Sequence, residues 1–148
     1  MKKSLFRFID RLELLSCYAL CFGFNTMFDF AKTLNVDSDL LRNFLKQLFD
    51  YQMYIVILLS FIVVIFHYQM VNRKKVELHC RVLVGDTIYT AVLRYTVECL
   101  AILCVAFTIS VILNVILNIN LANNAYLFCI FVVYILISSR LVSRFENI

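Results

Sequence analysis

Proline is absent from this 148-residue sequence, glycine occurs twice, and only 16% of the residues are charged. An average soluble domain has about 25% charged residues and about 45–50% apolar residues. Here 63% of the residues are hydrophobic, and the mean hydropathy is +0.87. The scarcity of charge argues against an ordinary soluble domain and predicts a chain whose solvent is lipid.

A long basic tract is also missing. The net charge is +4, but the Lys and Arg residues stand in short groups beside apolar runs. This pattern is typical of a membrane orientation signal rather than of nucleic-acid binding. We therefore expect membrane lipids, and no nucleic acid, among the partners.

The familiar catalytic motifs are missing as well. The sequence contains no Ser-His-Asp grouping, no Gly-rich phosphate loop and no HExxH motif. We therefore expect no enzymatic activity and no bound cofactor on this chain. His67 and His79 could ligate a metal together with Cys80, but no second ligand pair stands at a recognisable spacing.

The six cysteines favour a structural role. They lie in or beside apolar stretches, whereas disulfide scaffolds are small and water-soluble, so we interpret them as small apolar side chains. Cys17 and Cys21 are one helical turn apart, as a redox pair would be, but the reactive dithiol of a quinone-linked thiol oxidase is usually CxxC. We expect no cleavable signal peptide, because the first apolar run has no small-residue cleavage site. The cysteines are Cys17, Cys21, Cys80, Cys99, Cys104 and Cys129.

Four apolar stretches are long enough to cross a bilayer, which takes about 20 residues in a helix. The first is the weakest, since Glu13 and Asp29 stand at its ends and Asn25 lies inside. Charges near the ends of a span can reach the interface. The chain is therefore predicted to be an all-α membrane protein with four transmembrane helices. The predicted spans are 12–30, 52–71, 95–119 and 125–139.

Polar segments flank these spans. Residues 1–11 mix basic and apolar side chains, which predicts an amphipathic helix at the membrane surface. Residues 31–51 have apolar side chains every three or four positions, with Asp37 or Ser38 as the N-cap, which predicts a short external amphipathic helix. The short link INLANN requires the last two spans to form an antiparallel hairpin. We expect the intramembrane amides to form bonds between helices; they are Asn25, Asn114 and Asn118.

The distribution of Lys and Arg predicts the orientation. Eleven of them lie in the N-terminal segment, the loop 72–94 and the C-terminal tail, and three lie in 31–51. Basic residues are enriched on the cytoplasmic side of membrane proteins. Both termini and the loop 72–94 are therefore predicted to be cytoplasmic.

The loop 72–94 is predicted to be helical on both sides of a break at Gly85. Glycine tolerates the left-handed conformation that ends a helix, and Asp86 is expected to cap the next one. We predict an amphipathic coupling helix over 73–84 and a second helix from 87 to about 118. That second helix is about 48 Å long and must project beyond a hydrocarbon core of about 30 Å.

These residues resemble a known family. The run Arg73-Lys74-Lys75-Val76-Glu77, then Leu83-Val84-Gly85-Asp86 and Glu98 thirteen residues after the glycine, is similar to the signature of FtsX-like permeases. These permeases are the membrane domains of MacB-type ABC transporters, and the resemblance covers about residues 52–140. The family usually has a large extracytoplasmic domain after its first span. In this chain that region has only about twenty residues.

The resemblance implies a permease subunit in the bacterial plasma membrane. The cytoplasmic loop would dock on a separate ATP-binding subunit that holds ATP and Mg²⁺, and two permease halves would form a homo- or heterodimer. The expected substrate is a peptide, lipid or lipoprotein. Arg94 and Glu98, one helical turn apart, would pair with each other or contact the second half. The expected coupling residues are Arg73, Lys74, Lys75, Glu77, Arg81, Gly85 and Asp86.

Two other hypotheses remain for comparison. The chain could be a stand-alone membrane protein, such as an immunity protein against a membrane-active peptide, which would need no ATP-binding partner. A proton-coupled drug exporter would instead require an acidic residue in the middle of the membrane. Glu13 and Glu98 both lie near the inner edge of their spans, which argues against the exporter.

Overall fold

The computed structural model describes residues 7–34, 38–85 and 87–144, and for residues 78, 82 and 141–144 it describes the backbone alone. This part of the chain is helical and contains no β-strand. Four of its helices are long and apolar enough to span a membrane, which confirms the predicted fold class. The helices are α1 (Phe8–Thr33), α2 (Asp39–Asp50), α3 (Gln52–Leu83), α4 (Ile88–Ile116) and α5 (Ala122–Arg144).

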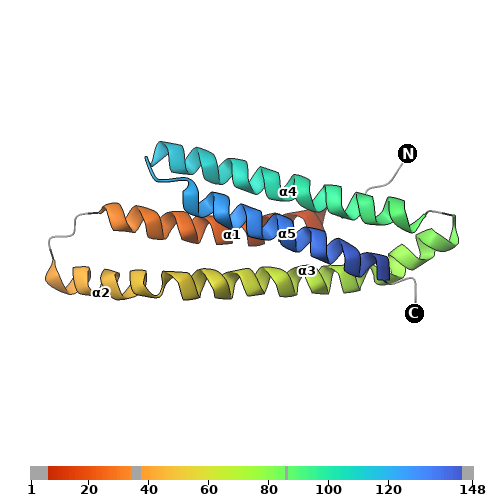
Figure 1. Cartoon of the computed structure of the whole chain (residues 1–148), viewed down its shortest axis with the longest axis horizontal. Helices are drawn as coiled ribbons and strands as arrows, with labels where there is room; N and C mark the ends of the chain where they lie inside the picture. Colours follow the sequence, from red (N-terminus) through yellow and green to blue (C-terminus); the bar gives the residue numbers. More distant parts are fainter. Residues whose placement is uncertain (1–6, 35–37, 86, 145–148) are drawn as a thin grey trace.

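The four long helices form one elongated bundle (Figure 1). Helices α3 and α4 lie along its two edges, and α1 and α5 lie between them. Helix α1 packs against each of the other three long helices, and α4 and α5 form the antiparallel hairpin that the short link predicts. The short helix α2 lies end to end with α3, beside the end of α1 (Figure 1).

Helix α1 begins at Phe8 and continues without a break into the first predicted span. Asp10 stabilises its first turn, because the Asp10 carboxylate accepts a hydrogen bond of 3.1 Å from the backbone N–H of Arg7. Residues 8–11 are therefore the first turn of α1 and not part of a separate surface helix. The rest of the expected surface helix, residues 1–6, lies outside the described residues.

Helix α3 contains both the second span and the expected coupling helix. The helix is continuous from Gln52 to Leu83, so residues 73–83 extend the span instead of forming a separate helix. The last turns of α3 bend toward the start of α4 (Figure 1). Gly85 has φ +104°, which confirms the predicted left-handed residue after the helix.

The N-cap of α4 corrects a prediction. The cap is Thr87, whose Oγ1 accepts a hydrogen bond of 3.4 Å from the Thr90 N–H, and not Asp86, which lies outside the described residues. Thr and Asp side chains can both cap a helix. Thr87 is the cap here because it directly precedes the first helical residue, Ile88. From that cap α4 runs unbroken for 29 residues, about 44 Å, as expected for a helix longer than the bilayer is thick.

A backbone motif ends α4. Asn118 has φ +53°, its N–H donates to the Val115 carbonyl at 3.3 Å, and the Ile119 N–H donates to the Asn114 carbonyl at 2.9 Å. This pattern is a Schellman motif with asparagine in the left-handed position. Asn118 therefore lies in the exposed link to α5, and not between helices as expected.

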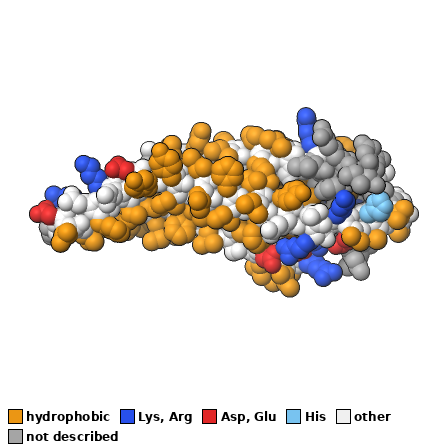
Figure 2. Space-filling model, turned by 90° about the horizontal axis from the view of Figure 1, so that it is seen from below, with side chains coloured by type: hydrophobic (Ala, Val, Ile, Leu, Met, Phe, Trp, Pro, Cys, Tyr) orange, Lys and Arg blue, Asp and Glu red, His pale blue; other side chains and the backbone are white. Residues whose placement is uncertain are grey.

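The surface of the bundle matches a bilayer. Hydrophobic side chains cover its middle, and charged side chains gather at its two ends (Figure 2). Inside, one apolar cluster joins the four long helices, with each helix contributing residues at helical spacing. The largest buried apolar and aromatic side chains are Leu14, Tyr18, Phe22, Val63, Met70, Tyr95, Leu103, Phe131 and Ile135.

Candidate functional site

The predicted site residues that the structure describes lie at one end of the bundle, which we call the charged end. It consists of the start of α1 (residues 7–13), the end of α3 (73–83), the turn at Gly85 and the start of α4 (87–98). Asp86 belongs to this set but lies outside the described residues. The fold thus brings the N-terminal segment against the predicted coupling residues.

Lys74 is buried at the charged end. Its ammonium lies 3.0 Å from the Asp10 carboxylate of α1 and 3.2 Å from the Glu77 carboxylate of its own helix. The Lys74 and Asp10 side chains are only 9% and 12% exposed. Lys74 therefore joins α3 to α1, and its charge faces α1 and not a surface where a partner could bind.

Two further ion pairs connect the helices. The Arg73 guanidinium lies 2.9 Å from the Glu13 carboxylate, joining α3 to α1, and remains 55% exposed. Arg11 lies 3.6 Å from the Glu98 carboxylate, joining α1 to α4. Within α3, Arg81 lies 3.0 Å from Glu77. Asp10, Glu13 and Arg11 were not predicted as partners of these site residues.

Three more of the predicted site residues are half-buried at the charged end. Lys75 and Arg94 are half-buried on α3 and α4. Glu98 is also half-buried, and it pairs with Arg11 across the helices. An intrahelical pair was expected between Arg94 and Glu98. The Glu98–Arg11 contact links α4 to α1.

Apolar side chains are exposed around the α3–α4 turn. Leu83 and Tyr89 are each 76% exposed, and Val84 is 89% exposed. Nothing lies within 4 Å of the position where a Cβ on Gly85 would stand. We call these four residues the tip. The tip lies beyond the ion pairs, at the far end of the bundle from α2 (Figure 1).

A buried histidine joins the four long helices above the charged end. His67 of α3 bonds through Nε2 to the Tyr18 hydroxyl of α1 and through Nδ1 to the Tyr95 hydroxyl of α4, at 3.2 Å. The Tyr95 hydroxyl also bonds to the Ser138 hydroxyl of α5 at 2.8 Å. We call these four residues the histidine layer. Both ring nitrogens have protein partners, so the layer is a closed network.

Amides form a second buried layer toward the other end. Asn25 of α1 donates to Asn124 of α5 at 2.6 Å and accepts from Gln52 of α3 at 3.2 Å. Asn124 also donates to the hydroxyls of Thr26, at 3.0 Å, and Ser110, at 2.7 Å. These five residues are the amide layer. The expected interhelical role is confirmed for Asn25.

Asn114 differs from Asn25. It is buried on α4, and its Oδ1 has no hydrogen-bond partner among the described residues. The predicted interhelical bond is therefore not seen at this oxygen.

The ion pairs and the two buried polar layers join helices to one another. In the described parts of the chain, no cluster of three His, Cys, Asp or Glu side chains could hold a metal ion. The polar groups inside the bundle bond mainly to one another, and the exposed chemistry lies at the tip and among the half-exposed charges. Comparison with protein-family models, with curated proteins and with solved structures found no match for this chain.

Proposed function

We propose that this chain is the transmembrane subunit of an ABC transporter of the MacB/FtsX type. It would couple ATP hydrolysis on a separate subunit to the movement of a peptide, lipid or lipoprotein across the bacterial inner membrane. The observation that carries the proposal is the tip, where apolar Leu83, Val84 and Tyr89 are exposed beyond the ion pairs of the charged end. Such a surface fits an apolar pocket on a partner protein.

The lengths of the helices support this role. Helix α3 has 32 residues and α4 has 29, about 48 and 44 Å, whereas the hydrocarbon core is about 30 Å thick. Both helices are therefore longer than the hydrocarbon core, and their additional turns lie at the tip. With the basic residues on the cytoplasmic side, both termini and the tip face the cytosol.

The ion pairs support a rigid connection between the tip and the membrane-embedded bundle. Lys74–Asp10 and Arg73–Glu13 attach α3 to α1, and Arg11–Glu98 attaches α4 to α1. A displacement of the tip by the ATP-binding subunit would therefore move α1 together with α3 and α4. In this mechanism Lys74 and Glu98 hold the helices in position, and the exposed tip side chains make the contact.

The second permease half would lie against the lipid-facing surface of this bundle, as a homo- or heterodimer. The described part of the short region between α1 and α3 contains one helix, α2, so this subunit would recognise its substrate within the membrane.

Site-specific photocrosslinking in native membranes tests the proposal. A photoreactive benzoylphenylalanine at Val84 should crosslink to a cytosolic protein that binds an ATP resin. The same residue at Leu40, which is equally exposed on α2 at the other end of the bundle, is the matched control and should not form that crosslink. Adding Leu83→Glu and Tyr89→Glu should remove the crosslink, because charges oppose burial in an apolar pocket.

The opposite result would favour a stand-alone protein. If the Val84 probe crosslinks only to lipid while the chain is fully inserted, or if it crosslinks only to proteins that bind no ATP, the coupling role is wrong.

A further inference from the structure

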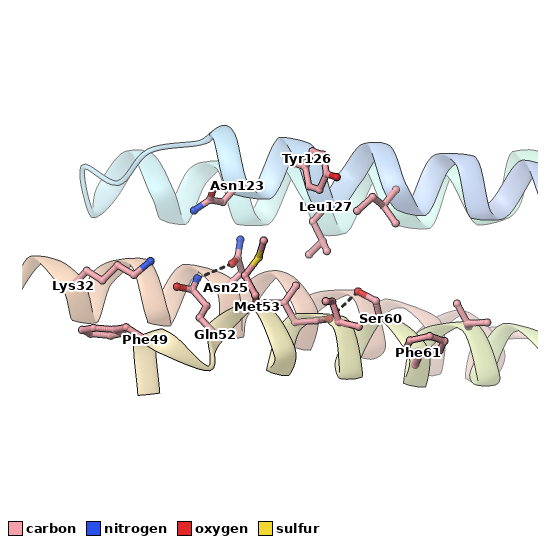
Figure 3. Close-up of a pocket in the computed structure, with 14 residues that line it drawn as sticks. Asn25, Lys32, Phe49, Gln52, Met53, Ser60, Phe61, Asn123, Tyr126 and Leu127 are labelled. Carbon is pink, nitrogen blue, oxygen red and sulfur yellow. Dashed lines mark hydrogen bonds between the residues drawn. The ribbon is translucent and has the colours of Figure 1, made fainter. Parts of the chain in front are cut away.

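A groove runs between α3 and α5 on the side of the bundle near α2. It has a volume of about 670 Å³, within the range of about 300–1,000 Å³ that is common for ligand pockets. Figure 3 shows Met53 and Phe61 of α3 on one side and Tyr126 and Leu127 of α5 on the other. Most of the lining is apolar, and Ile57 also contributes to it. We call this pocket the lateral groove.

A polar contact lies at each end of the apolar part of the lateral groove. At one end Gln52 bonds to Asn25 at 3.2 Å, shown as a dashed line in Figure 3. At the other end the Tyr134 hydroxyl donates to the Val64 carbonyl at 3.1 Å and ties α5 to α3. Gln52 and Val64 are twelve residues apart on one helix, about 18 Å. Half of a hydrocarbon core of about 30 Å is about 15 Å, so the groove has the depth of one leaflet.

The groove opens to the side, toward lipid. Met53, Phe61 and Tyr126 line it and are also largely exposed on the surface of the bundle. In a membrane the space between them borders hydrocarbon chains, and water is costly there because it lacks hydrogen-bond partners. A lipid acyl chain matches the apolar lining and the depth of the lateral groove.

The polar end of the groove carries positive charge. Lys32 lines it and also lines an adjacent hollow of about 290 Å³, to which Arg42 and Lys46 of α2 contribute. Figure 3 shows Lys32 and the Asn123 amide at this same end of the groove. Three basic side chains around one hollow provide the charge that a phosphate group requires.

Acidic residues lie close to these cations: Asp50 lines a further hollow together with Lys46, and Asp29 lies beside Lys32. Asp29 is 3.5 Å from the Lys32 ammonium, a long contact on a half-exposed lysine. The Asp29 carboxylate also accepts bonds from Asn123, at 3.0 and 3.3 Å, and from Gln52 at 3.5 Å. Because several amides share the charge of Asp29, the Lys32 ammonium keeps the capacity to bind a second anion.

We propose that the lateral groove binds one anionic phospholipid. One acyl chain lies between α3 and α5, and the phosphate lies against Lys32 with Arg42 and Lys46 around it. This inference is independent of the proposed transport function, because it uses only the groove, its depth and the charges at its end.

Native mass spectrometry of the full chain, released from vesicles of phosphatidylglycerol and phosphatidylcholine in equal amounts, tests the proposal. The wild-type protein should retain one phosphatidylglycerol. Ile57→Trp places an indole in the groove and should lose that lipid. Leu58→Trp, an exposed position one residue along that does not line the groove, is the matched control and should retain it.

The headgroup site has its own variant. Lys32→Gln should lower the preference for phosphatidylglycerol over phosphatidylcholine about fivefold, the factor expected for one lost lysine near a lipid phosphate. Lys75→Gln, at the opposite end of the bundle, should leave the preference unchanged. Far-UV circular dichroism of each variant checks that the helices are intact.

Two outcomes would overturn the inference. Equal retention by Ile57→Trp and Leu58→Trp would mean that the lipid is carried on the general surface of the bundle. Equal amounts of the two lipids on the wild-type protein would remove the anionic site. Neither outcome bears on the crosslink expected at Val84, so the two proposals can fail separately.

Discussion

The two ends of the bundle hold the same helices together with different chemistry. At the charged end, α1 and α3 are joined by ion pairs, Lys74–Asp10 and Arg73–Glu13. Toward the other end, they are joined by neutral amides, through Asn25 and Gln52. Charged side chains lie beyond the apolar middle of the surface (Figure 2), whereas the amides are buried within the bundle.

The difference follows from the cost of burying charge. An ionised side chain taken out of water loses several kcal/mol of solvation, whereas a neutral amide loses less and recovers it through two or three hydrogen bonds. Charged pairs are therefore tolerated where they stay near water, and neutral amides can join helices where the side chains are buried between them. Lys74 is the exception, since it is charged and nearly fully buried, so removing its side chain should have the largest effect.

Lys74→Met should lower the free energy of unfolding by about 3 kcal/mol, because it leaves the Asp10 carboxylate buried without its cation. Arg73→Met, the neighbouring and largely exposed pair, should cost less than about 1 kcal/mol. Unfolding in mixed micelles titrated with dodecyl sulfate, followed by circular dichroism, measures both. Adding Asp10→Asn to Lys74→Met should restore more than half of the loss. Equal effects at Lys74 and Arg73 would show that burial does not separate the two pairs.

Asn124→Leu should cost about 2 kcal/mol, because it removes three hydrogen bonds and leaves buried partners on α1 and α4 unsatisfied. Asn72→Leu makes the same change at an exposed site on α3 and should be nearly neutral. The temperature of irreversible unfolding in bilayer nanodiscs ranks the two variants. A stable Asn124→Leu variant would mean that packing alone joins α1 and α5 at this level.

Tyr95→Phe should have the smallest of the three effects, about 1 kcal/mol, because the hydroxyl is lost but the ring still fills its buried site. Tyr68→Phe removes a hydroxyl from an exposed tyrosine on the same helix as His67 and serves as the control. Hydrogen exchange of the backbone around His67 and Ser138 measures the local opening. Unchanged exchange in Tyr95→Phe would show that the histidine layer adds nothing to the packing of its rings.

The four long helices were predictable because each is one continuous apolar stretch of the sequence. The 29 residues of α4, its hairpin with α5 and the left-handed Gly85 follow from hydropathy, link length and residue type. The boundaries were less predictable. The expected coupling helix is the end of α3, because the helix continues without a break past residue 71, where the predicted span ends.

The pairing of side chains across helices was not predictable. Glu13 and Arg73 are 60 residues apart, and Tyr18 and His67 are 49 apart. Lys74 was expected on a docking surface because a basic run next to a span is usually solvated, yet the fold places it against Asp10. No local pattern indicates which face of α3 turns toward α1.

The sequence by itself determined that this chain is a membrane protein and that it forms four long apolar helices. These properties depend on the transfer of apolar residues and on hydrogen bonds within each helix, which neighbours in the chain decide. Only the tertiary structure decided which charges are buried, how the two polar layers close and where a groove of one leaflet's depth remains. Those features depend on how the four helices are rotated against one another, and that rotation is set by packing over the whole bundle.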